Sequence, residues 1–139
     1  LLSNLYSELA AESDKILDSL RSGKTVSEMN PVLLSLYRPS VQPYIISWIK
    51  YDPAAEIKKL KIPVLIIQGT TDIQVSIDDA RLLSEGKPDA RLLIFDNMNH
   101  LLKESKAGIQ ENVATYYKPE LPLKQGLVED LASFIKNKK

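Results

Sequence analysis

Two short apolar runs with a helical pattern between them most constrain the fold of this chain. The runs occupy residues 63–69 and 90–96 and are apolar at successive positions, which is typical of strands buried on both faces of a parallel sheet. Between them, Ser76-Ile-Asp-Asp79 has the pattern of a helix capping box, and Gly86 follows as a helix-ending residue. The sequence therefore predicts a parallel βαβ unit with strands at 64–68 and 91–95 and a helix at 77–85.

An acidic side chain and a histidine follow the carboxyl ends of the two predicted strands. Asp72 comes after Gly69-Thr-Thr, and His100 comes after Asn97-Met-Asn. Loops at the carboxyl ends of parallel strands meet at one edge of the sheet and commonly hold functional residues. A carboxylate that accepts a hydrogen bond from imidazole Nδ1 leaves Nε2 free to take a proton. Each residue by itself is more often an ordinary turn residue, but together they suggest an acid–base pair.

The first 50 residues have only helical patterns. Four apolar residues of the first segment recur at spacings that share one helix face: Leu5, Leu9, Ile16 and Leu20. Gly23 is expected to stop this helix. Two further helical segments are predicted at 32–37 and 41–49, the second with Ser40 as its N-cap.

After residue 50, helices and strands alternate. Asp52-Pro53 predicts a helix start, with proline at the first helical position and the helix running to Leu60. A helix is expected at about 107–117, and a last amphipathic helix at 123–136. The sequence thus indicates an α/β chain of two segments, 1–50 and 51–139.

Composition excludes several classes of function. Lys plus Arg and Asp plus Glu are 18 each, so no net charge favours nucleic acid or an anionic membrane. The chain has no cysteine and one histidine, which excludes thiol catalysis and makes a metal site unexpected. No apolar run reaches the ~18 residues of a membrane span. We expect no cofactor, and the sequence leaves cytoplasmic and periplasmic locations equally open.

The segment from Asp52-Pro53 to Leu102 resembles the C-terminal part of the α/β-hydrolase fold. The resemblance is carried by Leu60-Lys-Ile-Pro-Val-Leu-Ile-Ile-Gln-Gly-Thr-Thr-Asp72 and by Asp96-Asn-Met-Asn-His-Leu-Leu102. It is strongest to bacterial members of the serine aminopeptidase and lysophospholipase-like branch. The resemblance implies that Asp72 is the catalytic acid and His100 the catalytic histidine. It also implies that 1–50 is a helical lid and 51–139 the C-terminal part of the hydrolase core.

The nucleophile of that family is missing from this sequence. It lies on a G-x-S-x-G turn, whereas the five glycines here include no pair four residues apart. The chain also begins without methionine. We therefore expect a fragment of a serine hydrolase that acts on a small-molecule ester, thioester or amide and is inactive alone. Without the preceding strand, the apolar edge of 64–68 is expected to be covered by the missing N-terminal half or by a second copy.

Four residues are candidates for contact with substrate: Trp48, Tyr37, Gln74 and Val75. Trp48 and Tyr37 have amphipathic rings suited to the wall of a substrate pocket, although packing of the lid against the body is the favoured explanation for most apolar residues of that segment. Gln74 and Val75 directly follow the acid, where packing at the helix entry is an equal alternative.

Two alternatives to a hydrolase fragment remain. The chain is alternatively a non-catalytic binding or interaction module that retains the hydrolase scaffold, because fold alone does not give function. A complete flavodoxin-like domain is the weaker alternative, since only two clear strands occur and neither is followed by a phosphate-binding glycine loop. The sequence before Leu1 would separate these classes.

Overall fold

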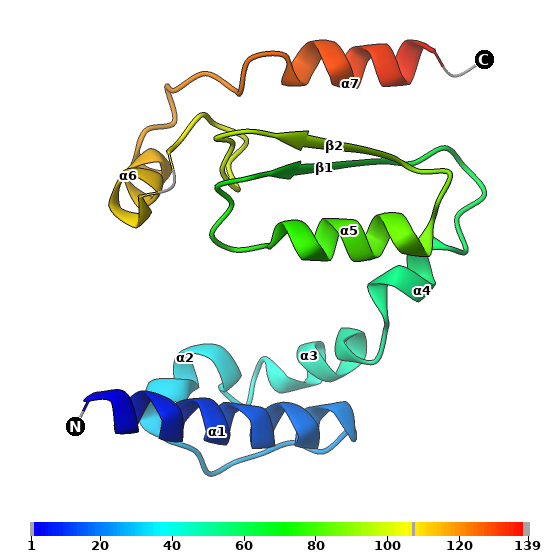
Figure 1. Ribbon diagram of the computed structural model, residues 1–139. Helices are drawn as coiled ribbons and strands as arrows, with labels where there is room; N and C mark the ends of the chain where they lie inside the picture. The colour runs from blue at the N-terminus through cyan, green and yellow to red at the C-terminus, as the bar shows by residue number, and fades with distance from the viewer. Residues whose placement is uncertain (1, 107, 138–139) are drawn as a thin grey trace. The chain divides into compact units, whose positions relative to one another are not determined.

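The computed structural model describes residues 2–106 and 108–137. The chain divides into two compact units, Leu1–Asp52 and Pro53–Lys139 (Figure 1). Over these described residues, the first unit contains helices and no strand, and the second combines helices with two strands.

The first unit is a small helical bundle. Its elements in chain order are α1 (Leu2–Arg21), η1 (Pro31–Leu33), α2 (Leu34–Tyr37) and α3 (Gln42–Ile49). Its core consists of four buried side chains, Ile16, Leu20, Leu33 and Tyr37. The predicted face of the first helix is therefore buried at Ile16 and Leu20, whereas Leu5 is exposed.

The start of α3 differs from the prediction. Ser40 does not cap this helix: Val41 is at the N-cap position and makes no side-chain cap bond. The Ser40 hydroxyl instead accepts a hydrogen bond from Arg38 Nε at 3.2 Å. The first helical residue, Gln42, is fully buried, and its side-chain amide binds the backbone of Val26 and Tyr37. A glutamine inside the unit thus fixes the position of α3.

The second unit contains the predicted βαβ arrangement. Its elements in chain order are α4 (Pro53–Ile57), β1 (Leu65–Gly69), α5 (Ile77–Gly86), β2 (Arg91–Phe95), α6 (Ile109–Ala114), η2 (Thr115–Tyr117) and α7 (Leu127–Lys136). Strands β1 and β2 are parallel, with Leu65 opposite Arg91 and Gly69 opposite Phe95. Helix α5 contacts both strands, and α7 lies on the other side of the sheet (Figure 1). This is a partial α/β fold built around a two-stranded parallel sheet.

Local end signals in the sequence are confirmed at α4 and α5. Pro53 is the first residue of α4, although this helix ends at Ile57 and not at Leu60. At α5, the Ser76 side chain accepts from the Asp79 N–H, and the Asp79 side chain accepts from the Ser76 N–H. Gly86 is the last residue of α5.

The two C-terminal helices are shorter than predicted. Helix α6 begins at Ile109, and Ala107 of the predicted range lies outside the described residues. Helix α7 begins at Leu127 and not at Leu123. The residues before it pair with the loop after β2: Leu123 bridges to Lys103, and Lys124 N–H donates to Leu102 O at 2.7 Å. This long-range pairing prevents the earlier start of α7.

The described helices include no membrane-span candidate. None of those in residues 2–106 and 108–137 has both the length and the apolar composition that crossing a bilayer requires.

The loops after β1 and β2 are in direct backbone contact at Gly69. A Cβ atom at this position would lie 1.9 Å from Met98 O and 2.5 Å from Met98 C. Thr71 N–H donates to the same Met98 carbonyl at 3.2 Å, and Asn97 N–H donates to Thr70 Oγ1 at 2.9 Å. Only glycine permits the two loops to approach this closely.

We expect Gly69→Ala to destabilise the second unit by about 1–3 kcal/mol, because the added methyl forces two backbone segments apart. Urea denaturation of the variant and the parent chain measures this change. Gly108→Ala is the matched control, since its nearest contact would be a flexible Glu111 side-chain atom at 3.9 Å. Equal effects at the two glycines would contradict the assigned role of Gly69.

Candidate active site

Asp72 is a nearly buried carboxylate in the loop after β1. Its side chain is 7% exposed. One oxygen, Oδ1, accepts hydrogen bonds from the N–H groups of Gln74 at 2.8 Å and Val75 at 3.0 Å. An aspartate followed by a turn commonly binds the next backbone N–H groups in this way. The turn therefore fixes the orientation of the carboxylate and directs the other oxygen away from the backbone.

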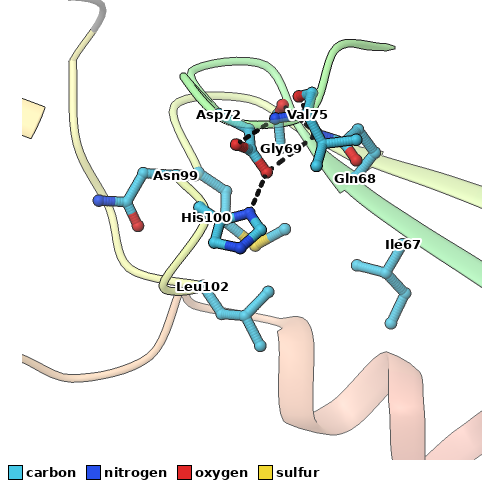
Figure 2. A pocket seen from close by; sticks show the side chains of 9 residues that line it. Ile67, Gln68, Gly69, Asp72, Val75, Asn99, His100 and Leu102 are labelled. Carbon is cyan, nitrogen blue, oxygen red and sulfur yellow. Dashed lines mark hydrogen bonds and ion pairs between the residues drawn. The ribbon is translucent and has the colours of Figure 1, made fainter. Parts of the chain in front are cut away.

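His100 lies in the loop after β2 and faces that other oxygen. The distance from His100 Nδ1 to Asp72 Oδ2 is 2.9 Å, and Figure 2 shows the imidazole between the Asp72 carboxylate and the Leu102 side chain. The His100 side chain is 40% exposed. Because β1 and β2 are parallel neighbours in register, both residues reach the same edge of the sheet. The structure thus brings together the two residues that the sequence singled out.

Gln68 completes the surroundings of the acid. It is buried on β1, and its Nε2 donates to Asp72 Oδ2 at 3.2 Å and to Val75 O at 3.0 Å. The same carboxylate oxygen therefore accepts from both Gln68 and His100. With the two backbone donors on Oδ1, the carboxylate has four hydrogen-bond donors around it.

These donors determine the charge of Asp72. Burial by itself would raise the pKa of Asp72, but hydrogen bonds from the Val75 and Gln74 N–H groups and from His100 outweigh it. The pKa of Asp72 is consequently held below its ordinary value. An ionised carboxylate only accepts hydrogen bonds, so the proton between the two side chains belongs to His100 Nδ1. The neutral ring then has a free acceptor at Nε2.

A small cavity of about 160 Å³ opens beside this pair. Its wall is largely apolar and comes from both strand ends and both loops. The lining residues are Ile67, Gln68, Gly69, Asp72, Val75, Met98, Asn99, His100 and Leu102 (Figure 2).

The four predicted substrate residues are in different surroundings. Val75 lines the cavity. The Gln74 side chain donates to Tyr116 Oη at 2.6 Å and so binds the segment around η2. Tyr37 is buried in the core of the first unit, with its hydroxyl 2.8 Å from Ser13 Oγ, which does not favour a substrate contact. Trp48, in the same unit, is 51% exposed and close to the Tyr44 ring.

Several buried polar residues around the pair were not predicted from the sequence. Besides Gln68, they are Thr71, Asn99, Asn112 and Thr115. The side chains of these five residues make hydrogen bonds either to residues distant in the chain or to residues of the neighbouring loops. Their only sequence signal is polar character at positions within or next to apolar segments.

The described residues hold no candidate metal site. In residues 2–106 and 108–137, no three His, Asp or Glu side chains gather as metal ligands would.

Comparison with known proteins indicates a hydrolase-like relationship. The chain is similar to the esterase EstD of Thermotoga maritima, with 32% identity over 108 residues. The alignment covers 68% of this chain and 26% of the esterase, so the chain spans about a quarter of the length of this curated relative. No family model matches the chain, and no solved structure matches it. The chain is a weak homologue of an esterase.

We expect Asp72 to make stability depend on pH in a defined direction. Its folded pKa lies below the ordinary value of about 3.9. Its contribution is therefore fully present above that value and is lost as the pH falls through the folded pKa. The measurement compares the free energy of unfolding in urea of two chains, one with Asp72 and one with Asp72→Asn, from pH 6 to pH 2.5.

Both chains of that pair carry His100→Gln, so that no imidazole titrates. The Gln74 and Val75 donors remain in both. The stability difference should be constant at the upper end of the range and should shrink below about pH 4. A difference that does not change with pH would contradict a lowering of the pKa of Asp72 by the Gln74 and Val75 N–H groups.

Proposed function

We propose that this chain supplies the acid and the histidine of a Ser-His-Asp triad in an α/β-hydrolase. The substrate class is a small-molecule ester, thioester or amide. The single observation that supports this most is the 2.9 Å contact between His100 Nδ1 and an ionised, nearly buried Asp72. The similarity to an esterase supports the same reaction class.

In the proposed mechanism His100 acts first as a base and then as an acid. Nε2 takes the proton of a serine hydroxyl while Oγ attacks the substrate carbonyl. The same nitrogen then gives this proton to the leaving alcohol, thiol or amine, and an acyl-enzyme remains. Water, deprotonated in turn by Nε2, attacks the acyl carbon, and Nε2 then returns this proton to Oγ as the bond between Oγ and the acyl carbon breaks and the acid leaves. Asp72 stays ionised throughout and stabilises the imidazolium form.

The nucleophile in this proposal comes from outside the 139 residues. The sequence contains no G-x-S-x-G turn. Ser76, which follows the acid most closely, caps α5 through its hydroxyl. We therefore assign the serine and the oxyanion-binding loop to a preceding segment of a longer protein, in which residues 1–50 serve as a lid and 51–139 complete the core.

The proposal predicts the behaviour of the longer protein toward two reagents. A fluorophosphonate probe should label its serine, and it should hydrolyse p-nitrophenyl acetate. His100→Ala should lower kcat/KM by about 10³-fold or more, because no other group takes the serine proton. Arg81→Ala is the control, since Arg81 is exposed on α5 and away from both loops.

Failure would take one of two forms. Unchanged turnover in His100→Ala would refute the assignment of the histidine. Absence of any labelled serine in the longer protein would favour the alternative of a binding module on a hydrolase scaffold.

The sheet supports a partner along β1. In the described part of the chain the sheet has two strands only, so β1 pairs on one side. Val64 O accepts from the Arg91 N–H, and Thr70 N–H donates to Phe95 O, so both groups face β2. Backbone N–H and C=O groups of successive strand residues point to opposite sides. Those of Leu65, Ile67 and Gly69 therefore point to the side of β1 that faces away from β2. Two-stranded sheets are rarely stable by themselves. We assign this edge to the preceding strand of the longer protein, or to a second copy when the chain is alone.

Light scattering should accordingly give the isolated chain a mass above 15.6 kDa. Ile67→Pro should restore the monomer mass, because proline removes an N–H only from the free edge. Ile62→Ala is the control: it shortens an exposed apolar side chain outside the strand and should leave the mass unchanged. A monomeric parent chain would contradict the self-pairing.

A further inference from the structure

One short segment binds both loops of the candidate site. This bridging segment, residues 108–119, contains α6, η2 and the two residues after η2. It lies outside the sheet and supplies no group to the contact between Asp72 and His100. Its polar side chains nevertheless make hydrogen bonds to both loops.

The bridging segment holds the acid loop at two points. Asn112, which is fully buried on α6, donates from Nδ2 to Thr71 O at 2.6 Å. Tyr116 Oη accepts from Gln74 Nε2 at 2.6 Å. Thr71 and Gln74 flank Asp72 in sequence, and the N–H of Gln74 is itself a donor to Asp72 Oδ1.

The same segment holds the histidine loop at two further points. Asn99, which is 1% exposed, donates from Nδ2 to Thr115 Oγ1 at 2.7 Å. Lys103, also buried, donates from Nζ to the carbonyls of Lys118 at 2.6 Å and Pro119 at 3.1 Å. Asn99 precedes His100 in the sequence, and Lys103 follows it three residues later.

Thr115 connects the two sets of contacts. Its hydroxyl accepts from Asn99 and donates to Asn112 O at 2.7 Å. Asn112 and Thr115 are three residues apart, so they share one side of the helical segment. A chain of buried hydrogen bonds thus runs from the residue before His100, through Thr115 and Asn112, to the residue before Asp72.

Asn99 also shapes the turn that carries His100. Its Oδ1 accepts from the N–H groups of Leu101 and Lys103, both at 3.1 Å. Within this turn Leu102 has a φ of +60°, a left-handed conformation that is unfavourable for leucine. The turn therefore depends on the contacts of Asn99, and Asn99 depends on Thr115.

We propose that Thr115, Asn112 and Asn99 are positioning residues, which hold the histidine loop against the acid loop so that Asp72 keeps the His100 proton on Nδ1. This inference rests on the proposed function of the Asp72–His100 pair. It concerns the distance between the two loops and adds no group that touches a substrate.

The single histidine of the chain makes the proposal directly measurable. With one His in the sequence, ¹⁵N NMR of the imidazole at a pH where the ring is neutral reports the populations of the Nδ1–H and Nε2–H forms of His100 alone. Histidine without a carboxylate partner favours the Nε2–H form. We expect the parent chain to favour Nδ1–H and Asp72→Asn to lose this preference.

Thr115→Val is the central variant, because it removes the hydroxyl and keeps the shape of the side chain. The ratio of Nδ1–H to Nε2–H should fall by roughly fivefold or more, because the variant loses both hydrogen bonds of the Thr115 hydroxyl, the one from Asn99 and the one to Asn112 O. Thr115→Ser, which restores the hydroxyl, should restore the ratio. Tyr116→Phe removes the hydroxyl that accepts from Gln74 and so weakens the same segment's hold on the acid loop. If Thr115→Val does not fold, this variant provides the test.

Lys87→Met controls for a purely structural effect. Buried Lys87 donates to Leu60 O and to the Asp89 carboxylate at the amino ends of the strands. These ends lie five residues of strand, about 16 Å, from the site. Its replacement should lower the unfolding midpoint and leave the tautomer ratio unchanged.

The outcomes separate the two proposals. If Asp72→Asn shifts the tautomer ratio but Thr115→Val and Tyr116→Phe leave it unchanged, the positioning role is overturned. A fall in Lys87→Met as large as that in Thr115→Val would overturn it as well. An unchanged ratio in Asp72→Asn would instead refute the acid–histidine pair on which the proposed function depends.

Discussion

Parallel pairing of β1 with β2 is the constraint on which the rest of the second unit depends. The register places Gly69 opposite Phe95, so the two strands end side by side and their loops leave from the same edge. The missing side chain of Gly69 then lets the Met98 backbone approach. The contact between Asp72 and His100 follows from this approach, because each residue is only a few positions beyond the end of its strand.

The carboxylate of Asp72 illustrates how such a site stays charged while largely buried. Removing a carboxylate from water is unfavourable unless hydrogen bonds replace the lost solvation. Here two backbone N–H groups, a glutamine and the imidazole provide that replacement. The backbone donors come from the turn itself, so part of the electrostatic environment is already fixed by the local sequence Asp72-Ile-Gln-Val75.

The sequence predicted those parts of the fold that local signals determine. Pro53, the Ser76 capping box and Gly86 define helix ends through interactions within a few residues, and they occur as predicted. Both strands were located to within one residue because each is a compact apolar run. The prediction was wrong where distant residues decide: α7 starts late because Leu123 and Lys124 pair with the histidine loop. Asn99 and Thr115 were missed for the same reason, since they are 16 residues apart and become neighbours only after folding.

The left-handed backbone of Leu102 has a wider consequence. A leucine in this conformation costs roughly 1–2 kcal/mol relative to the right-handed region, and the turn exists only because its surroundings supply that free energy. The position of the imidazole is thus a property of the whole unit and is not encoded by the residues adjacent to it alone. Sequence changes in α6 or before α7 can therefore alter the chemistry of the histidine while its own turn remains identical, and relatives with the same motif need not share the same reactivity.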